Sequence, residues 1–477
     1  MRSLTRTLAL LFLALPLVGQ QTAPAPAKAP AKPAAQKSVT PAKPGAAMPA
    51  PGASPAIALR GGRLLTITHG VIENGVIVME NGKITAVGAA AAVSIPKNAR
   101  VIDVKGMTVY PGLIDSRTQL GLTEIEAVEM SNDLVEASEE IMPHMRVEDA
   151  FHAESELIPV TRMNGITNAV VTASARDTLP GQMSFIQLAG RDRDEMLLLR
   201  SFAMPLNFTG AQRRRDAGSR FPSTRMGLAT QLRQAFIDAQ DYAQKWTEFE
   251  KKSAEPVKDD KDSKDSKDKD KDKDKGKPAA PKRDLKFEAL APYLQGKKPV
   301  VLTAEESSDL KVALSLAREF NLKVILGEVT YATNMLDEIA ATKLPVIVGN
   351  IFDTPKNGTR YDSVYTLPAE LAKRGVKIAF ASYDSHNSRN LPYEAGYAVA
   401  FGLPYEEALK ALTINPAEIW GVADQLGSLD VGKTANVVVA NGDPLDVKTD
   451  VKQVFIAGRE IPMTSRQTQL RDAYSQR

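Results

Sequence analysis

The 477-residue sequence contains no cysteine and only four histidines, His69, His144, His152 and His386. Without cysteine the chain can form no disulfide, no thiolate nucleophile and no cysteine-based zinc site. So few histidines also argue against a histidine-rich metal centre. The formal net charge is only +3, which gives no indication of a nucleic acid or an acidic membrane as a partner.

Long apolar runs are also missing. The run from Leu8 to Val18 follows Arg2 and Arg6 and is shorter than the ~20 residues that span a bilayer. This pattern predicts a signal peptide over residues 1–20, with an uncleaved anchor as the alternative. Residues 21–55 are mainly Ala, Pro and Lys, a composition that predicts a disordered linker. We expect export to a bacterial periplasm or to the extracellular space, with no membrane attachment after signal removal.

The rest of the chain carries strand and helix patterns. Short apolar segments that alternate with amphipathic ones indicate strand–helix units and a parallel sheet. The clearest strands are 300–302, 324–326, 345–348 and 376–380. Together with earlier strands they predict an α/β fold, a (β/α)8 TIM-type barrel over residues 109–422. The Lys/Asp-rich segment 251–284 cannot form a core and predicts a disordered insertion in this barrel, with a docking segment as the alternative.

One stretch combines a buried strand with a polar loop, Pro111-Gly112-Leu113-Ile114-Asp115-Ser116-Arg117-Thr118-Gln119. It resembles the first barrel strand of the amidohydrolase superfamily, which includes imidazolonepropionase and dihydroorotase and reads Pro-Gly-Leu-Ile-Asp-x-His-x-His there. Segments 181–188 and 222–227 resemble a secreted, imidazolonepropionase-like subgroup, and segments 427–433 and 442–445 resemble turns of the superfamily. The resemblance implies a small composite β-sandwich formed by residues 56–108 and 423–463, followed by a tail at 464–477. It also implies a hydrolase acting on non-peptide carbon–nitrogen bonds.

The same resemblance locates the site at the ends of the barrel strands. Arg117 and Gln119 stand where the relatives have two metal-binding histidines. Thr303 stands at another histidine position, and Leu206 aligns, to within about a residue, with a metal-bridging glutamate. Asp384 matches an aspartate that binds metal and moves a proton. Because arginine remains protonated and repels a dication, we expect no metal and no cofactor.

We therefore predict Asp384 as the catalytic residue. The predicted ligand-binding residues are Arg117, Gln119, Thr303, Glu328 and His386. We expect the Arg117 guanidinium to pair with Asp384 or Glu328 across the barrel mouth, because a semi-buried carboxylate needs a partner.

Three functions agree with these residues. The first is an amidohydrolase-type hydrolase with a degenerate metal site and weak or absent catalysis. The second is a non-catalytic barrel that binds a small molecule at the mouth. The third is an inactive subunit that pairs with an active amidohydrolase paralogue or with itself. No nucleic-acid partner is expected.

Overall fold

The computed structural model describes residues 56–208, 221–254 and 279–475. The predicted signal peptide and linker, and residues 255–278 of the predicted insertion, lie outside these ranges. The described residues all belong to one of two compact units, Met48–Arg477. Within them, no helix is both long and apolar enough to cross a membrane.

Strands from both ends of the chain form one sheet. Its order is β16-β15-β14-β5-β1-β2-β3, and β4 pairs with β1. The three C-terminal strands, β14 to β16, therefore join the N-terminal ones through the antiparallel pair β14–β5. The strands are β1 (Ile57–Leu65), β2 (Val71–Glu80), β3 (Lys83–Ala89), β4 (Arg100–Asp103), β5 (Thr108–Pro111), β14 (Val437–Ala440), β15 (Val451–Ile456) and β16 (Arg459–Ile461).

The core of this sheet draws on both ends of the chain. Leu59, Ile77, Val437 and Phe455 are buried in a single hydrophobic cluster. The Asn81-Gly82 turn joins β2 to β3 as an antiparallel hairpin, and both turn residues have positive φ, 51° and 78°. This conformation favours Asn and Gly at such a hairpin.

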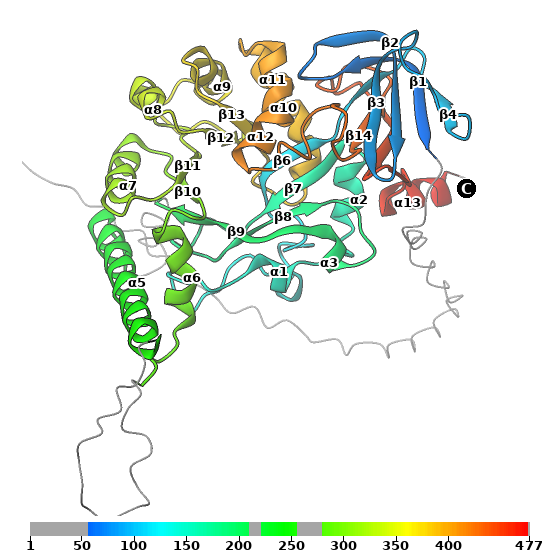
Figure 1. Ribbon diagram of the computed structural model, residues 1–477. Helices are drawn as coiled ribbons and strands as arrows, with labels where there is room; N and C mark the ends of the chain where they lie inside the picture. Colours follow the sequence, from blue (N-terminus) through cyan, green and yellow to red (C-terminus); the bar gives the residue numbers. More distant parts are fainter. Residues whose placement is uncertain (1–55, 209–220, 255–278, 476–477) are drawn as a thin grey trace, which may run out of the picture. The chain divides into compact units, whose positions relative to one another are not determined.

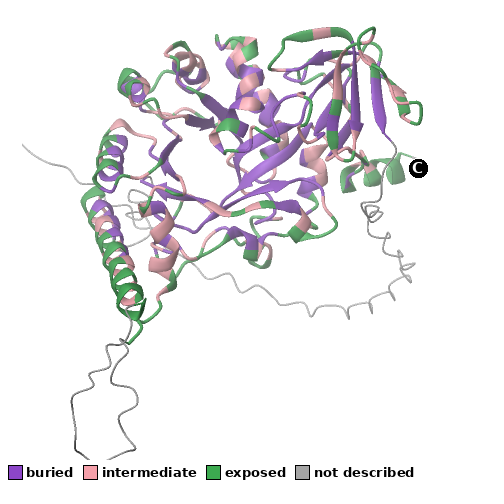
Figure 2. Ribbon diagram, in the orientation of Figure 1, coloured by how far each residue is buried: buried purple, intermediate pink, exposed green. Residues whose placement is uncertain are grey.

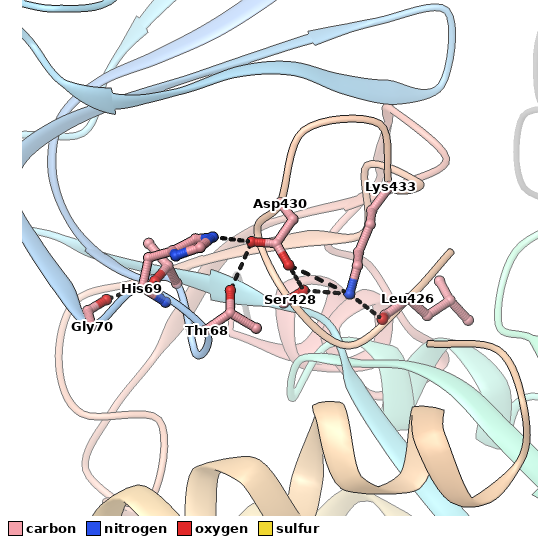
Figure 3. Close-up of polar contacts among 8 residues, drawn as sticks. Thr68, His69, Gly70, Leu426, Ser428, Asp430 and Lys433 are labelled. Atoms are coloured by element: carbon pink, nitrogen blue, oxygen red, sulfur yellow. Dashed lines mark hydrogen bonds and ion pairs between the residues drawn. The ribbon is translucent and has the colours of Figure 1, made fainter. Parts of the chain in front are cut away.

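A polar network ties the turn after β1 to the C-terminal part of the chain (Figure 3). Asp430 is at its centre and accepts hydrogen bonds from Thr68 Oγ1 at 2.7 Å and Ser428 Oγ at 2.6 Å. His69 Nε2 lies 3.1 Å from the same carboxylate, and Lys433 Nζ lies 3.6 Å from it. His69 therefore has a structural role in the sheet, outside the barrel.

The second sheet is the barrel, with the order β13-β12-β11-β10-β9-β8-β7-β6. The barrel fold is confirmed, but the described strands are not all parallel, because β8 runs antiparallel to both β7 and β9. The strands are β6 (Leu113–Thr118), β7 (Ile166–Val171), β8 (Met183–Gln187), β9 (Leu197–Asn207), β10 (Val300–Thr303), β11 (Val324–Gly327), β12 (Val346–Gly349) and β13 (Ile378–Ala381).

The first and last barrel strands meet just beyond β13. Tyr383 N donates to Arg117 O at 2.9 Å, and Gln119 N donates to Asp384 O at 3.2 Å. Alternate strand residues fill the interior, where Ile114, Val301 and Ile347 share one cluster. The residues between them face the helices, so the strands are buried on both sides (Figure 2).

Helices surround much of the barrel, and α5 packs against α6 (Figure 1). Helix α5 continues to residue 254, so its last turn lies inside the range expected for the charged insertion. The helices are α1 (Val147–Ala150), α2 (Leu157–Arg162), α3 (Arg193–Met196), α5 (Arg225–Ala254), α6 (Leu285–Leu294), α7 (Ser307–Glu319), α8 (Leu336–Thr342), α9 (Ser363–Lys373), α10 (Leu391–Ala400), α11 (Tyr405–Leu412), α12 (Ile414–Ile419) and α13 (Arg466–Tyr474), with 3-10 turns η1 (Glu129–Ser131), η2 (Thr333–Met335) and η3 (Asn387–Asn390).

Gly112 separates β5 of the first sheet from β6, the first barrel strand. Its N–H donates to Asn436 O at 2.9 Å. A Cβ atom at this position would lie 2.1 Å from Thr167 Oγ1, well inside van der Waals contact. Only glycine allows this close approach, and the junction sets the direction in which β6 enters the barrel.

Candidate ligand-binding site at the barrel mouth

A cavity of about 310 Å³ opens at the carboxyl ends of the barrel strands. Its walls come from the segments that follow β6, β7, β10, β11, β12 and β13, which is the face where barrels of this type carry their chemistry. The lining is mostly polar and includes Arg117, Gln119, Ser174, Glu305, Glu328, Tyr331, Asn350, Asp353, Lys356 and Tyr383.

Arg117 occupies the floor of this cavity. It comes from β6, and its guanidinium crosses the interior to the opposite wall. Nη1 donates to Thr303 Oγ1 at 2.6 Å, and Nη2 donates to Asn207 Oδ1 at 3.3 Å. The guanidinium carbon lies 5.0 Å from the centre of the Tyr383 ring, within the range of a cation–π contact. Only 1% of the residue is exposed.

The two acceptors of Arg117 are neighbours. Thr303 and Asn207 are paired in register on β10 and β9, so their side chains lie side by side on the inner wall. Asn207 also donates through Nδ2 to Asp177 O at 2.8 Å. Leu206 instead lies in the outer cluster between strands and helices. The alignment of Leu206 with a site position is therefore one residue off, and Asn207 is the residue that faces inward.

The structure does not bear out the expected ion pair of Arg117 with Asp384 or Glu328, because the guanidinium donates to Thr303 and Asn207 instead. The Asp384 carboxylate accepts hydrogen bonds from Asn387 N at 3.0 Å and Asn387 Nδ2 at 2.9 Å. Its carbonyl oxygen accepts from Thr118 Oγ1 at 2.6 Å and Ser388 Oγ at 2.7 Å. Asp384 therefore holds the turn η3 in place and fixes the closure of the barrel.

Of the other predicted site residues, some line the cavity and others do not. Gln119 and Glu328 line the cavity together with Arg117, and Thr303 is fully buried beneath them. Glu328 has a left-handed backbone, with φ at 49°. His386 is not among the residues that line the cavity; its Nδ1 atom lies 3.2 Å from Ser385 Oγ.

Asp115 lies just below the floor and was not predicted as a site residue. Its Oδ1 atom accepts from Ser382 N at 3.0 Å and Arg117 N at 3.2 Å, and its Oδ2 atom accepts from Ser382 Oγ at 2.5 Å. Burial raises the pKa of Asp115 to about 7, with a smaller rise from the charge of Asp384, against the lowering effect of the Ser382 bonds. The residue joins the two ends of the barrel, which a single strand motif cannot reveal.

A second buried carboxyl group lies nearby, on α10. Glu394 Oε2 accepts from Ile351 N at 3.4 Å, and 3% of the residue is exposed. Burial raises the pKa of Glu394 well above its usual value, and the charges of Asp115 and Asp384 raise it further. Burial in this environment therefore favours the neutral form of the Glu394 carboxyl group over the charged form.

Lys356 forms one side of the rim. Its Nζ atom lies 2.8 Å from Glu305 Oε2 and 2.9 Å from Glu306 Oε1, and 4.2 Å from the centre of the Tyr331 ring. These contacts fix the loop that follows β12 against the end of β10. Lys356 and Glu306 were not predicted as site residues, because they come from loops whose partners depend on the fold.

Comparison with known proteins identifies the scaffold. Residues 332–461 match the model of the amidohydrolase family. The solved structure of an amidohydrolase from Thermotoga maritima superposes with a TM-score of 0.74 and 26% identity, covering 86% of this chain and all of that one. These matches support a relationship to the amidohydrolase superfamily. The amidohydrolase tasK of Hapsidospora irregularis is 24% identical over 405 residues, which are 80% of this chain but 39% of that protein.

Two further comparisons are more limited. The N-acetylglucosamine-6-phosphate deacetylase of Caenorhabditis elegans is 31% identical over 134 residues, which are 28% of this chain and 29% of that one. Phenylurea hydrolase B has a TM-score of 0.52 at 15% identity, covering 86% of this chain and 97% of that one. At that identity the match shows a shared amidohydrolase fold only.

The amidohydrolase superfamily implies a divalent metal at the mouth, but the residues here do not fit one. A permanent cation, Arg117, occupies the floor and uses the inner side chains of β9 and β10 as its own acceptors. Elsewhere in residues 56–208, 221–254 and 279–475, no group of three or more histidine, aspartate or glutamate side chains could hold a metal ion. A site for zinc requires at least three such ligands.

Proposed function

We propose that this amidohydrolase-fold protein binds a small polar molecule at the barrel mouth and does not carry out metal-dependent hydrolysis. The observation that supports this most directly is the Arg117 guanidinium, buried in the cavity floor and bonded to Thr303 and Asn207. A fixed positive charge at this point opposes a second cation. The cavity of about 310 Å³ lies at the small end of the range for ligand pockets.

Loss of a metal has a large effect on hydrolysis. Metal binding lowers the pKa of water from 15.7 to about 7, so its absence forfeits on the order of 12 kcal/mol of hydroxide activation at neutral pH. A general base regains only a factor of ~10²–10⁴. Asp384 and Asp115 are poor candidates for this base, because their carboxylate oxygens already accept hydrogen bonds from Asn387, Ser382 and Arg117.

The test compares hydrolysis and binding in the same preparation. The protein, freed of its signal peptide, is assayed against a panel of N-acyl amino acids, lactams and ureas, with EDTA and then with added zinc or manganese. We expect no turnover above the uncatalysed rate under either condition, and binding of at least one panel compound by calorimetry. Turnover that requires added metal and is lost in Arg117→Ala would overturn the proposal.

A further inference from the structure

A second cavity, which we call the α10 cavity, lies beside helix α10 and shares no lining residue with the mouth. Its volume is about 710 Å³, within the range of small-molecule pockets. No lysine, arginine or histidine is among the residues that line it. The side chains that give the wall its character are four aromatic rings and two carboxylates, Phe352, Tyr393, Tyr397, Tyr405, Asp443 and Asp446.

A close contact between α10 and the turn after β14 brings the rings and the carboxylates together. Tyr393 and Tyr397 are four residues apart on α10, so they lie on the same face of the helix. Gly396 lies between them, and a Cβ atom there would lie 2.5 Å from Leu445 O. The absence of a side chain at Gly396 therefore lets the helix approach the turn that carries both carboxylates.

The aromatic part of the wall is open to a ligand. Phe352 is 46% exposed and Tyr397 is 47% exposed, although both are large apolar side chains. Their ring centres are 5.5 Å apart, and the ring planes are nearly perpendicular, at 81°. Phe401 stacks on Tyr397 with its ring centre at 5.9 Å. The Tyr397 ring is therefore held in place before a ligand binds, which limits the side-chain freedom that binding would cost.

The carboxylates are held by neutral donors. Asp443 Oδ1 accepts from Tyr405 Oη at 3.0 Å and from Leu445 N at 2.9 Å. Asp446 Oδ1 accepts from Lys448 N at 2.9 Å. Both aspartates are exposed, and neither forms an ion pair with a side chain in the part of the chain that the structure describes. The wall thus carries two negative charges and no positive one, which favours a cation over an anion.

We infer that the α10 cavity binds a small organic cation. Its ammonium group lies beside Asp443 and Asp446, and its apolar body packs on Phe352 and Tyr397. Aromatic faces attract a cation through their quadrupole, and the carboxylates add charge complementarity. A neutral molecule of the same shape gains the apolar contact alone, and an anion is repelled. This site is separate from the mouth, so the inference does not depend on the proposed function.

Three probes with one apolar body and different charges test the inference. The cation 2-phenylethylammonium, the neutral 2-phenylethanol and the anion phenylacetate are each titrated calorimetrically into the signal-free chain at pH 7. We expect the cation to bind at millimolar concentration or below, the alcohol to bind about tenfold more weakly, and phenylacetate not to bind. Equal binding of cation and alcohol, stronger binding of the anion, or no binding of the cation at millimolar concentration would overturn the inference.

Variants then locate the binding site. The double variant Asp443→Asn, Asp446→Asn should reduce the preference for the cation over the alcohol by about threefold or more. Phe352→Leu keeps an apolar contact but loses the ring, so it should weaken the cation more than the alcohol. Asp450→Asn is the matched control, because its exposed carboxylate does not line the cavity, and it should bind as the wild type does. A cation preference that is unchanged in the double variant would also overturn the inference.

Discussion

Replacement of Arg117 by methionine tests whether its buried guanidinium is paired with an anion in the ligand-free fold. If the native fold paired Arg117 with a buried carboxylate, its removal would leave that anion unpaired and cost about 3–5 kcal/mol. Here the acceptors are neutral. The change removes a buried charge that has no anionic partner among the described residues, a gain of several kcal/mol, and leaves two acceptors without a donor, a loss of about 1–3 kcal/mol each. These effects largely offset one another, so we expect the free energy of unfolding of the ligand-free protein to stay within about 2 kcal/mol of wild type.

Urea denaturation of ligand-free protein, followed by circular dichroism, measures this difference. Arg225→Met is the matched control, because Arg225 pairs with Asp309, whose side chain is only 6% exposed. That variant leaves a buried carboxylate unpaired and should lose more stability than Arg117→Met. A loss of 3 kcal/mol or more in Arg117→Met, at about the size expected for a stranded anion, would refute the account of Arg117 as a buried charge that has only neutral acceptors among the described residues.

Three further predictions concern other parts of the chain. Burial raises the folded-state pKa of Asp115 from 3.8 to about 7. Its contribution to stability is therefore fully present below about pH 4 and is lost as the pH rises through about 7, a fall of about 4 kcal/mol at most. Asp115→Asn should reduce the dependence of the unfolding free energy on pH in denaturation series from pH 4 to pH 8, and an unchanged pH dependence would contradict the assignment. Gly112→Ala should lower the free energy of unfolding by about 2 kcal/mol or more, since its Cβ would lie 2.1 Å from Thr167 Oγ1. A denaturation midpoint equal to that of the wild type would show that the junction can shift to admit the Cβ atom. The predicted export and partnership are tested by expressing the tagged chain in a Gram-negative bacterium. We expect periplasmic protein that lacks residues 1–20, and full-length protein in the cytoplasm would contradict the export. Co-purification of an active amidohydrolase paralogue would favour the subunit role over the ligand-binding role.

The sequence was sufficient to predict the barrel and the sheet that combines both chain ends. Strand–helix alternation is most regular from residue 300 to 380, where β10 to β13 lie at or within two residues of their predicted bounds. It fails at β8, which lies between two strands without a long helix and runs antiparallel. A run of apolar residues carries no information on strand direction, which depends on how the connections pack.

The site was predicted in outline only. The run after Pro111 correctly located Arg117, because position along a strand motif is fixed by the backbone. Its partners were not predicted, because the guanidinium is long enough to reach several strand ends, and the sequence does not determine which. Adjacent residues of a strand face opposite sides and residues two apart face the same side. Strict alternation along β9 would therefore have favoured Asn207 over Leu206 as the residue that faces the barrel interior. Lys356 and Glu394 lie far along the chain, and only the fold brings them to the mouth.

Elemental analysis of the purified chain tests the central claim most directly. The protein is expressed with excess zinc and manganese, dialysed, and measured by mass spectrometry beside an Asp384→Ala variant. Because Arg117 already occupies the floor with Thr303 and Asn207 as its acceptors, we predict far less than one equivalent of metal per chain in both proteins. One equivalent that survives dialysis in the wild type and is lost in Asp384→Ala would contradict a mouth organised around an arginine.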